Sequence, residues 1–192
     1  GFAGELTTST GKSRSINTTA VVMGIIVAAA AVGIWQFIPE TGAEYGLTIN
    51  DVIDERRDPI RSTQAAIGYL SKLNKEFGGN WHLAMASYNA GERRIYKAVS
   101  DKGTINYWDL RDALAEETQF YVPKILALAI LDKYPDLFGV PQTSKKSSPL
   151  VLKQVTARQN QHVSTLAEMA EMDVEDFLAV NPHILKERLI VD

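Results

Sequence analysis

The sequence contains one long uncharged stretch, residues 15–39, in which Gln36 is the single strongly polar side chain between Ala20 and Ile38. A run of about 20 apolar residues is long enough to span a membrane as a helix. The basic residues Lys12 and Arg14 precede the stretch, as expected at a membrane boundary. The stretch is therefore either a transmembrane helix or part of a folded domain. Motifs elsewhere in the sequence are needed to distinguish these two alternatives.

Composition places the chain among globular proteins. It has 192 residues, of which 45% are hydrophobic and 22% charged. A net charge of −3 gives no electrostatic signal for nucleic acid. With no cysteine, the chain cannot have a disulfide scaffold, a cysteine-ligated zinc or a cysteine nucleophile. The three histidines, His82, His162 and His183, lack ligand spacing, so we expect neither a metal nor a cofactor.

The patterns divide the chain into four parts and predict a mainly α fold. Residues 1–19 are rich in Thr, Ser and Gly and are predicted to be loop or partly ordered. Residues 20–138 are predicted to form a helical domain. Residues 139–149 are polar and proline-containing, as in a linker. Residues 150–192 are predicted to form a small α+β module.

Capping residues and periodicity locate the helices of the larger part. Asp58-Pro59 is a typical helix start, and Asn80 can cap the following helix. The pattern also predicts helices over 92–99, 108–115 and 117–133. Because its apolar residues cover a broad face, we expect the last helix to be central to the core.

The last part alternates like a strand over 150–157 and again over 188–191. Between these predicted strands, Ser164 can cap one helix, and a second helix is expected over 174–180.

Three blocks carry candidate functional residues. In the first, Gly33 permits close backbone approach or a positive φ, and Gln36 stands between the aromatic residues Trp35 and Phe37. Flat apolar rings beside an amide are suited to sugars, although a buried aromatic corner would look the same.

In the second block, Tyr88 and Asn89 lie at a helix end before Gly91 and can direct polar groups into a cleft. An ordinary helix C-cap is the alternative. In the third, Glu117, Tyr121 and Lys124 are spaced to share one helix face. The alternative there is a solvated face with an i,i+4 pair.

Together, the order and content of these blocks resemble the lytic transglycosylase domain of the murein transglycosylase D type, which has a goose-lysozyme-like fold. The resemblance covers roughly Gly33 to Leu137. It rests on Gly33 to Pro39, Tyr45-Gly46-Leu47, Asp54 to Pro59 with Arg57, Ser62-Thr63, Ala65-Ala66, Tyr69-Leu70, Trp81, Tyr88 to Gly91, Glu117-Thr118 and Tyr121-Val122.

The resemblance implies cleavage of the MurNAc–GlcNAc β-1,4 bond of peptidoglycan, with formation of a 1,6-anhydro sugar. It implies that Gln36, Tyr88 and Asn89 line the sugar subsites and that Glu117 and Tyr121 flank the cleft. The implied partner is the glycan strand of peptidoglycan. The implied location is the bacterial cell envelope, on the periplasmic side, with membrane association as an option.

The sequence departs from this family at the catalytic acid. The family carries a Glu-Ser pair shortly before the block that begins here at Gly33, whereas Glu5 is the single acidic residue before Gly33 in this chain. Glu5 is therefore the candidate acid, with Phe2 and Leu6 as apolar neighbours. Two alternatives remain: a peptidoglycan-binding protein of the same fold without turnover, and a membrane-anchored scaffold.

The first block argues against the hypothesis of a membrane-anchored scaffold. If Gly33 to Ile38 belong to a sugar cleft, the remaining uncharged residues, 20–32, are short for a membrane span.

The C-terminal part resembles a degenerate LysM repeat, a module that binds GlcNAc-containing glycans. The resemblance rests on Leu166-Ala167, Val174, Phe177-Leu178, Asn181-Pro182 and Leu189 to Val191. Gln159-Asn160-Gln161 stands where the repeat usually has a Gly-Asp turn. A structural cap on the larger domain is the alternative.

Overall fold

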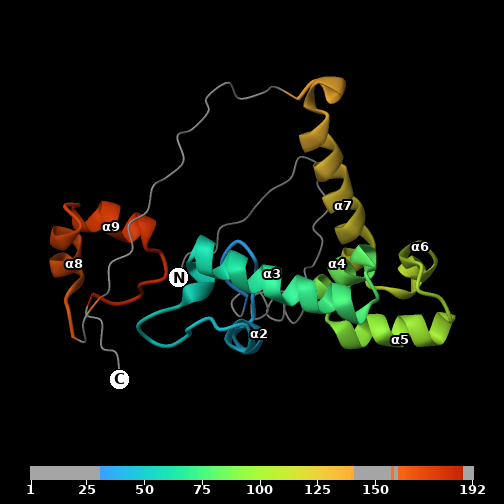
Figure 1. The fold of residues 1–192 in the computed structure, drawn as a ribbon, viewed down its shortest axis with the longest axis horizontal. Helices are drawn as coiled ribbons and strands as arrows, with labels where there is room; N and C mark the ends of the chain where they lie inside the picture. The colour runs from blue at the N-terminus through green and yellow to red at the C-terminus, as the bar shows by residue number, and fades with distance from the viewer. Residues whose placement is uncertain (1–30, 141–156, 158–159, 188–192) are drawn as a thin grey trace, which may run out of the picture.

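A computed structural model describes residues 31–140, 157 and 160–187, and this part of the chain is mainly helical (Figure 1). The prediction of a mainly α fold is thus confirmed, and the described residues contain isolated β-bridges but no named strand. The elements are α2 (Pro39–Glu44), η1 (Glu55–Arg57), α3 (Pro59–Glu76), α4 (Trp81–Ala90), α5 (Glu92–Lys102), α6 (Tyr107–Leu110), η2 (Arg111–Ala113), α7 (Glu116–Lys133), η3 (Pro135–Phe138), α8 (Val163–Met169) and α9 (Val174–Val180).

The predicted helix starts are confirmed by their capping bonds. The Asp58 side chain accepts the N–H groups of Ile60 and Arg61 at 2.8 and 3.0 Å, with Pro59 at the first helical position of α3. The Asn80 side chain accepts the N–H of Leu83 at the start of α4. These bonds satisfy N–H groups that have no partner within the helix.

Helix α4 is the centre of the larger part because it contributes to both buried clusters. One cluster fills the space between α4, α5, α6 and α7 and includes Leu83, Ile95, Tyr107, Leu110 and Val122. The other lies between α3, α4 and the segment before α3, and includes Phe37, Leu47, Ala66, Tyr69, Leu73 and Ala84.

The prediction that the helix over 117–133 is central to the core is wrong for its second half. In α7 only Thr118 and Val122 are buried, whereas Leu128 is 65% exposed. Helix α7 has 18 residues, about 27 Å, while α4 has 10, about 15 Å, so α4 can cover only part of its length. The far end of α7 projects from the other helices (Figure 1).

Two further predicted helices differ in extent. Helix α5 continues to Lys102, beyond the predicted end at Val99, because the left-handed Gly103 terminates it. The helix predicted over 108–115 is α6 followed by the 3-10 turn η2.

Residues 31–38 of the uncharged stretch are described, and none of them is helical. Val32 and Phe37 form an antiparallel bridge across a turn, and α2 begins at Pro39. The other residues of the stretch, the predicted loop over 1–19 and Glu5 lie outside the described residues. Among the helices that the structure does describe, none combines the length and apolarity needed to cross a bilayer.

Both helices predicted near the C-terminus are present, as α8 and α9. The cap of α8 is His162 rather than Ser164, since the His162 ring accepts the Ser164 N–H. Apart from Ala157, the strands predicted over 150–157 and 188–191 lie outside the described residues. A bridge between Ile53 and Ile184 joins this region to the larger part.

Candidate functional site

The segment Val32–Phe37, here called the Gly33 turn, folds back on itself. The Val32 N–H donates to the Phe37 carbonyl at 3.2 Å, and the Gln36 N–H donates to the Gly33 carbonyl at 3.3 Å. Gly33 has φ +77° and Gln36 has φ +52°, so the turn needs the left-handed region at two positions.

A close backbone approach explains why position 33 is glycine. A Cβ atom built on Gly33 would lie 1.8 Å from the carbonyl oxygen of Arg56. Both predicted reasons for glycine, a positive φ and a close approach, are confirmed at this position.

Arg56 also holds the end of the Gly33 turn through its side chain. Its guanidinium forms a two-point ion pair with Asp54, Nε to Oδ1 and Nη2 to Oδ2, each at 2.8 Å. Its Nη1 donates to the Phe37 carbonyl at 3.1 Å. The side chains of Arg56 and Asp54 are only 7% and 6% exposed. Burial favours the neutral form of the Asp54 carboxyl, but the hydrogen bonds and charge of Arg56 outweigh burial and lower its pKa.

Trp35 connects the Gly33 turn to the helices. Its indole N–H donates to the Thr63 hydroxyl on α3 at 2.8 Å, and its carbonyl accepts the Tyr88 hydroxyl of α4 at 2.9 Å. The Trp35 and Phe37 rings both meet the Tyr88 ring edge-on. Phe37 is buried and Trp35 is partly exposed, so Trp35 is the ring that a ligand can reach.

A row of three tyrosines continues from this contact. Tyr88 packs on Tyr69, and Tyr69 packs on Tyr45, with ring centroids 5.3 and 5.0 Å apart. The Tyr69 hydroxyl donates to Glu92 at 3.1 Å. Burial raises the pKa of Tyr69 and of Tyr88 far above the ordinary value, so both hydroxyls are neutral donors.

The C-terminus of α4 meets the N-terminus of α7 in a chain of polar contacts, here called the Asn89 cluster. The Thr118 hydroxyl donates to Asn89 Oδ1 at 2.8 Å, and Asn89 Nδ2 donates to Glu117 Oε1 at 2.9 Å. Thr118 is buried, Asn89 is partly exposed and Glu117 is exposed. The buried hydroxyl thereby sets which way the Asn89 amide faces, with its N–H groups toward Glu117.

Tyr121 of α7 and Tyr107 of α6 complete this region. Tyr121 is half-buried, and burial together with the Glu117 charge raises its pKa. It lies close enough to Tyr88 for their phenols to interact electrostatically. The buried Tyr107 hydroxyl donates to the carbonyls of Thr118 and Gln119, and so fixes the first turn of α7.

The structure therefore brings together four of the predicted site residues: Tyr88, Asn89, Glu117 and Tyr121. Gln36 follows Trp35, whose carbonyl accepts the Tyr88 hydroxyl, and one of its side-chain N–H groups donates to the Gly33 carbonyl at 2.6 Å. The second N–H of this amide and its carbonyl oxygen remain as groups that can meet a ligand. Glu5, the candidate acid, lies outside the described residues.

Sequence reasoning missed the residues that position this site. Asp54 and Arg56 lie in the block Asp54 to Pro59 that carries the resemblance, but neither of them was assigned a role from the sequence. Thr118 and Tyr107 lie in or next to the predicted motifs, but no local pattern shows that their hydroxyls are buried. The short spacing between Asp54 and Arg56 was the one available signal for an ion pair.

The arrangement combines a reachable aromatic ring, neutral phenols and an oriented amide and carboxylate. This is a set suited to an uncharged polyhydroxylated ligand, since rings contact sugar faces and amide or carboxylate groups bind hydroxyls. Within the described ranges, no group of three or more His, Asp or Glu side chains is placed to hold a metal ion.

Comparison with known proteins gives a family match and several similar proteins. The family described as "Transglycosylase SLT domain" matches residues 7–110. The chain is 38% identical over 162 residues to the protein named "Membrane-bound lytic murein transglycosylase D" of Escherichia coli (strain K12), covering 82% of this chain and 33% of that protein. It is also 38% identical over 71 residues to a "Putative tributyltin chloride resistance protein" of Alteromonas sp. (strain M-1), covering 37% of this chain and 34% of the relative.

The chain thus spans about a third of the length of these curated relatives. The family match covers more than half of the chain and contains the Gly33 turn, α3, α4 and α5. On this evidence, the chain belongs to the Transglycosylase SLT domain family.

Proposed function

We propose that this chain is a peptidoglycan lytic transglycosylase that cleaves the MurNAc–GlcNAc β-1,4 bond and leaves a 1,6-anhydroMurNAc end. The observation that carries the proposal is the Asn89 cluster, in which an oriented amide meets a carboxylate. Asn89 follows Tyr88, whose hydroxyl and ring contact the partly exposed Trp35 of the Gly33 turn. The Escherichia coli relative is named as a lytic murein transglycosylase, and this name supports the same reaction.

The reaction can proceed with a single carboxyl group. The acid protonates the leaving glycosidic oxygen, and the resulting carboxylate then accepts the proton of the substrate's own C6 hydroxyl. The C6 oxygen closes onto the anomeric carbon, so no water is consumed. Hydrolytic glycosidases, in contrast, generally use two carboxyl groups.

Glu117 is suited to binding rather than to proton donation. A general acid needs surroundings that favour its protonated form, such as apolar burial. Glu117 is exposed and already accepts an N–H from Asn89, so it lacks the apolar enclosure that a general acid needs. We therefore propose that Glu5 is the acid and that Gln36, Tyr88, Asn89, Glu117 and Tyr121 bind the glycan.

The setting of this activity would be the bacterial cell envelope, on its periplasmic side, where peptidoglycan is found. Membrane association is part of the proposal, in line with the name of the Escherichia coli relative. We further propose the division into residues 1–19, 20–138, 139–149 and 150–192, with the last part a LysM-like module.

Digestion of purified sacculi tests the proposed reaction and the proposed acid. The unsubstituted chain is expected to release soluble glycan fragments, and Glu5→Gln to release none above background. Glu117→Gln is the matched control, because it removes one exposed charge and is expected to lower the rate without abolishing it. Loss of release in Glu117→Gln with full release in Glu5→Gln would assign the acid to Glu117 instead. Sacculus binding without release would favour a non-catalytic binding protein.

The Asn89 cluster gives a second prediction. Thr118→Val keeps the shape of the buried side chain but removes the donor to Asn89 Oδ1, so the amide is free to turn away from Glu117. We expect sacculus binding to weaken roughly tenfold, about 1.4 kcal/mol, as for a lost hydrogen bond. Thr118→Ser retains the hydroxyl and should bind like the unsubstituted chain. Equal binding by the Val and Ser variants would remove the Asn89 amide from the site.

A further inference from the structure

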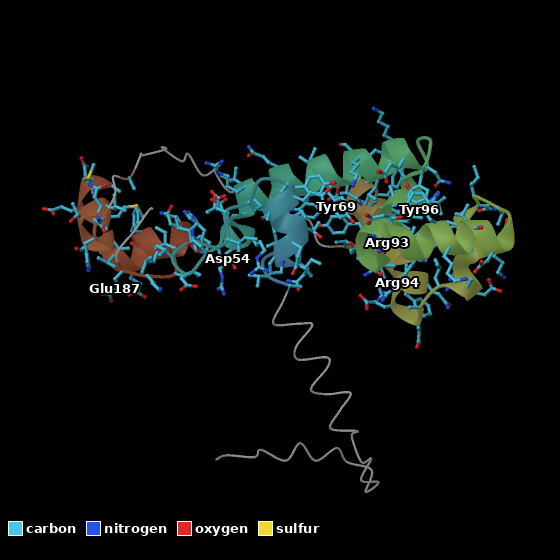
Figure 2. All side chains as sticks on the ribbon, turned by 90° about the horizontal axis from the view of Figure 1, so that it is seen from below. Asp54, Tyr69, Arg93, Arg94, Tyr96 and Glu187 are labelled. Carbon is cyan, nitrogen blue, oxygen red and sulfur yellow. The ribbon has the colours of Figure 1, made fainter. Side chains whose placement is uncertain are left out.

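The loop of residues 52–58, here called the 52–58 loop, pairs on one side with residues 183–185, here called the C-terminal segment. The Asp54 N–H donates to the His183 carbonyl and the Leu185 N–H donates to the Val52 carbonyl, both at 2.8 Å. Ile53 and Ile184 form the antiparallel bridge between these bonds. In Figure 2, Asp54 lies between the helices of the larger part and the C-terminal region, in which Glu187 is labelled.

The same loop has the Gly33 turn on its other side. Arg56, held by Asp54, donates to the Phe37 carbonyl, and the Arg56 carbonyl occupies the space that a side chain at Gly33 would need. Asp54 therefore takes part in both contacts, with its N–H on the C-terminal segment and its carboxylate on the arginine.

His183 makes a further contact with the end of the 52–58 loop. Its Nδ1 is buried and lies 3.5 Å from Asp58 Oδ2. The other oxygen of Asp58 caps α3, the helix whose Thr63 accepts the Trp35 indole N–H. The C-terminal segment thus contacts both of the supports that position the Gly33 turn: the Asp54–Arg56 pair and the start of α3.

We propose that the C-terminal segment His183–Leu185 is a positioning element of the glycan site: by pairing with the 52–58 loop it holds the Gly33 turn in its ligand-binding shape. If the segment leaves, water reaches Asp54, the ion pair is weakened by the higher dielectric, and the hold of Arg56 on Phe37 loosens. The part of the proposal that concerns glycan affinity rests on the proposed function of the Gly33 turn.

A single-tryptophan protein can report on this turn. Trp81 and Trp108 are 54% and 48% exposed, so Trp81→Phe with Trp108→Phe leaves Trp35 as the sole tryptophan without opening the core. In this background, Leu185→Pro removes the N–H that donates to Val52. Lys186→Pro is the matched control, since among the described contacts its N–H has no backbone acceptor. His183→Ala is a milder second variant that removes only the ring near Asp58.

Two measurements separate this inference from the proposed function. Acrylamide quenching of Trp35 without ligand is expected to rise about twofold in Leu185→Pro, to rise less in His183→Ala, and to stay unchanged in Lys186→Pro. Titration with chitohexaose, followed by Trp35 emission, is expected to show roughly fivefold weaker binding in Leu185→Pro.

Each result decides one point. Unchanged quenching in both Leu185→Pro and His183→Ala, with helical content retained by circular dichroism, would overturn the inference whatever the titration gives. A different result is that Leu185→Pro increases quenching while the background with Trp81→Phe and Trp108→Phe binds no chitohexaose. That result would support the positioning role and count against the proposed function.

Discussion

Replacing Arg56 by methionine is expected to lower the free energy of unfolding by about 3–5 kcal/mol, because Asp54 would remain as a buried charge without its partner. The pair is almost fully buried, and both of its hydrogen bonds are 2.8 Å long. The substitution also removes the donor to the Phe37 carbonyl, so the Gly33 turn should loosen as well. Urea denaturation at neutral pH measures the loss.

The neighbouring arginine is the control for this substitution. Arg57 is 48% exposed and lies 3.9 Å from Asp54, so Arg57→Met is expected to cost at most about 1 kcal/mol. Equal losses for the two methionine variants would contradict the assignment of Arg56 as the buried partner.

The pH dependence of stability gives the same pair a second test. The pKa of Asp54 is lower in the folded chain than in the unfolded one, so the pair contributes stability above the unfolded pKa, about 3.9. That contribution is lost as the pH falls through the lower folded pKa. Between pH 5 and pH 3 the unsubstituted chain should therefore lose more stability than a variant carrying both Asp54→Asn and Arg56→Met.

Gly33→Ala is expected to have the largest effect on ligand binding. The new Cβ would meet the Arg56 carbonyl oxygen at 1.8 Å, so backbone must shift, and the φ of +77° adds about 1–2 kcal/mol of strain. Because the turn presents Trp35 and Gln36, we expect sacculus binding to be lost together with at least about 3 kcal/mol of stability.

Gly46→Ala is the control that distinguishes the backbone strain of a positive φ from the steric clash of the added Cβ. Gly46 has φ +82° but no atom within 4 Å of an added Cβ, so this variant should show the strain alone, about 1–2 kcal/mol, and bind sacculi normally. If Gly33→Ala behaved like Gly46→Ala in both assays, the close contact with Arg56 would not be needed for the site.

The features that sequence predicted well are those that depend on neighbours in the chain. Asp58-Pro59 and Asn80 start helices because their side chains cap N–H groups two or three residues away. Gly33 was predicted to need a positive φ or a close approach, and it has both. Its aromatic neighbours and Gln36 are the side chains that the turn can present to a ligand. The grouping of Tyr88, Asn89, Glu117 and Tyr121 came from the family resemblance.

Features that depend on distant packing could not be predicted. The apolar residues of α7 look like a core face, but a sequence pattern does not state whether a partner surface covers them, and Leu128 is exposed. Arg56 lies within a run of charged residues, yet it is buried because the Gly33 turn and α2 close over it. Thr118 acquires its role only when α4 and α7 meet at Asn89.

The most direct test of the proposed function is the chemical structure of the glycan ends released from purified sacculi by the unsubstituted chain. Mass spectrometry after digestion in heavy-oxygen water distinguishes the two reactions, since internal attack by the C6 hydroxyl consumes no solvent while hydrolysis adds one solvent oxygen. We predict 1,6-anhydroMurNAc ends without the heavy isotope. Reducing ends that carry the heavy isotope, or the absence of any released fragment, would contradict the proposed lytic reaction.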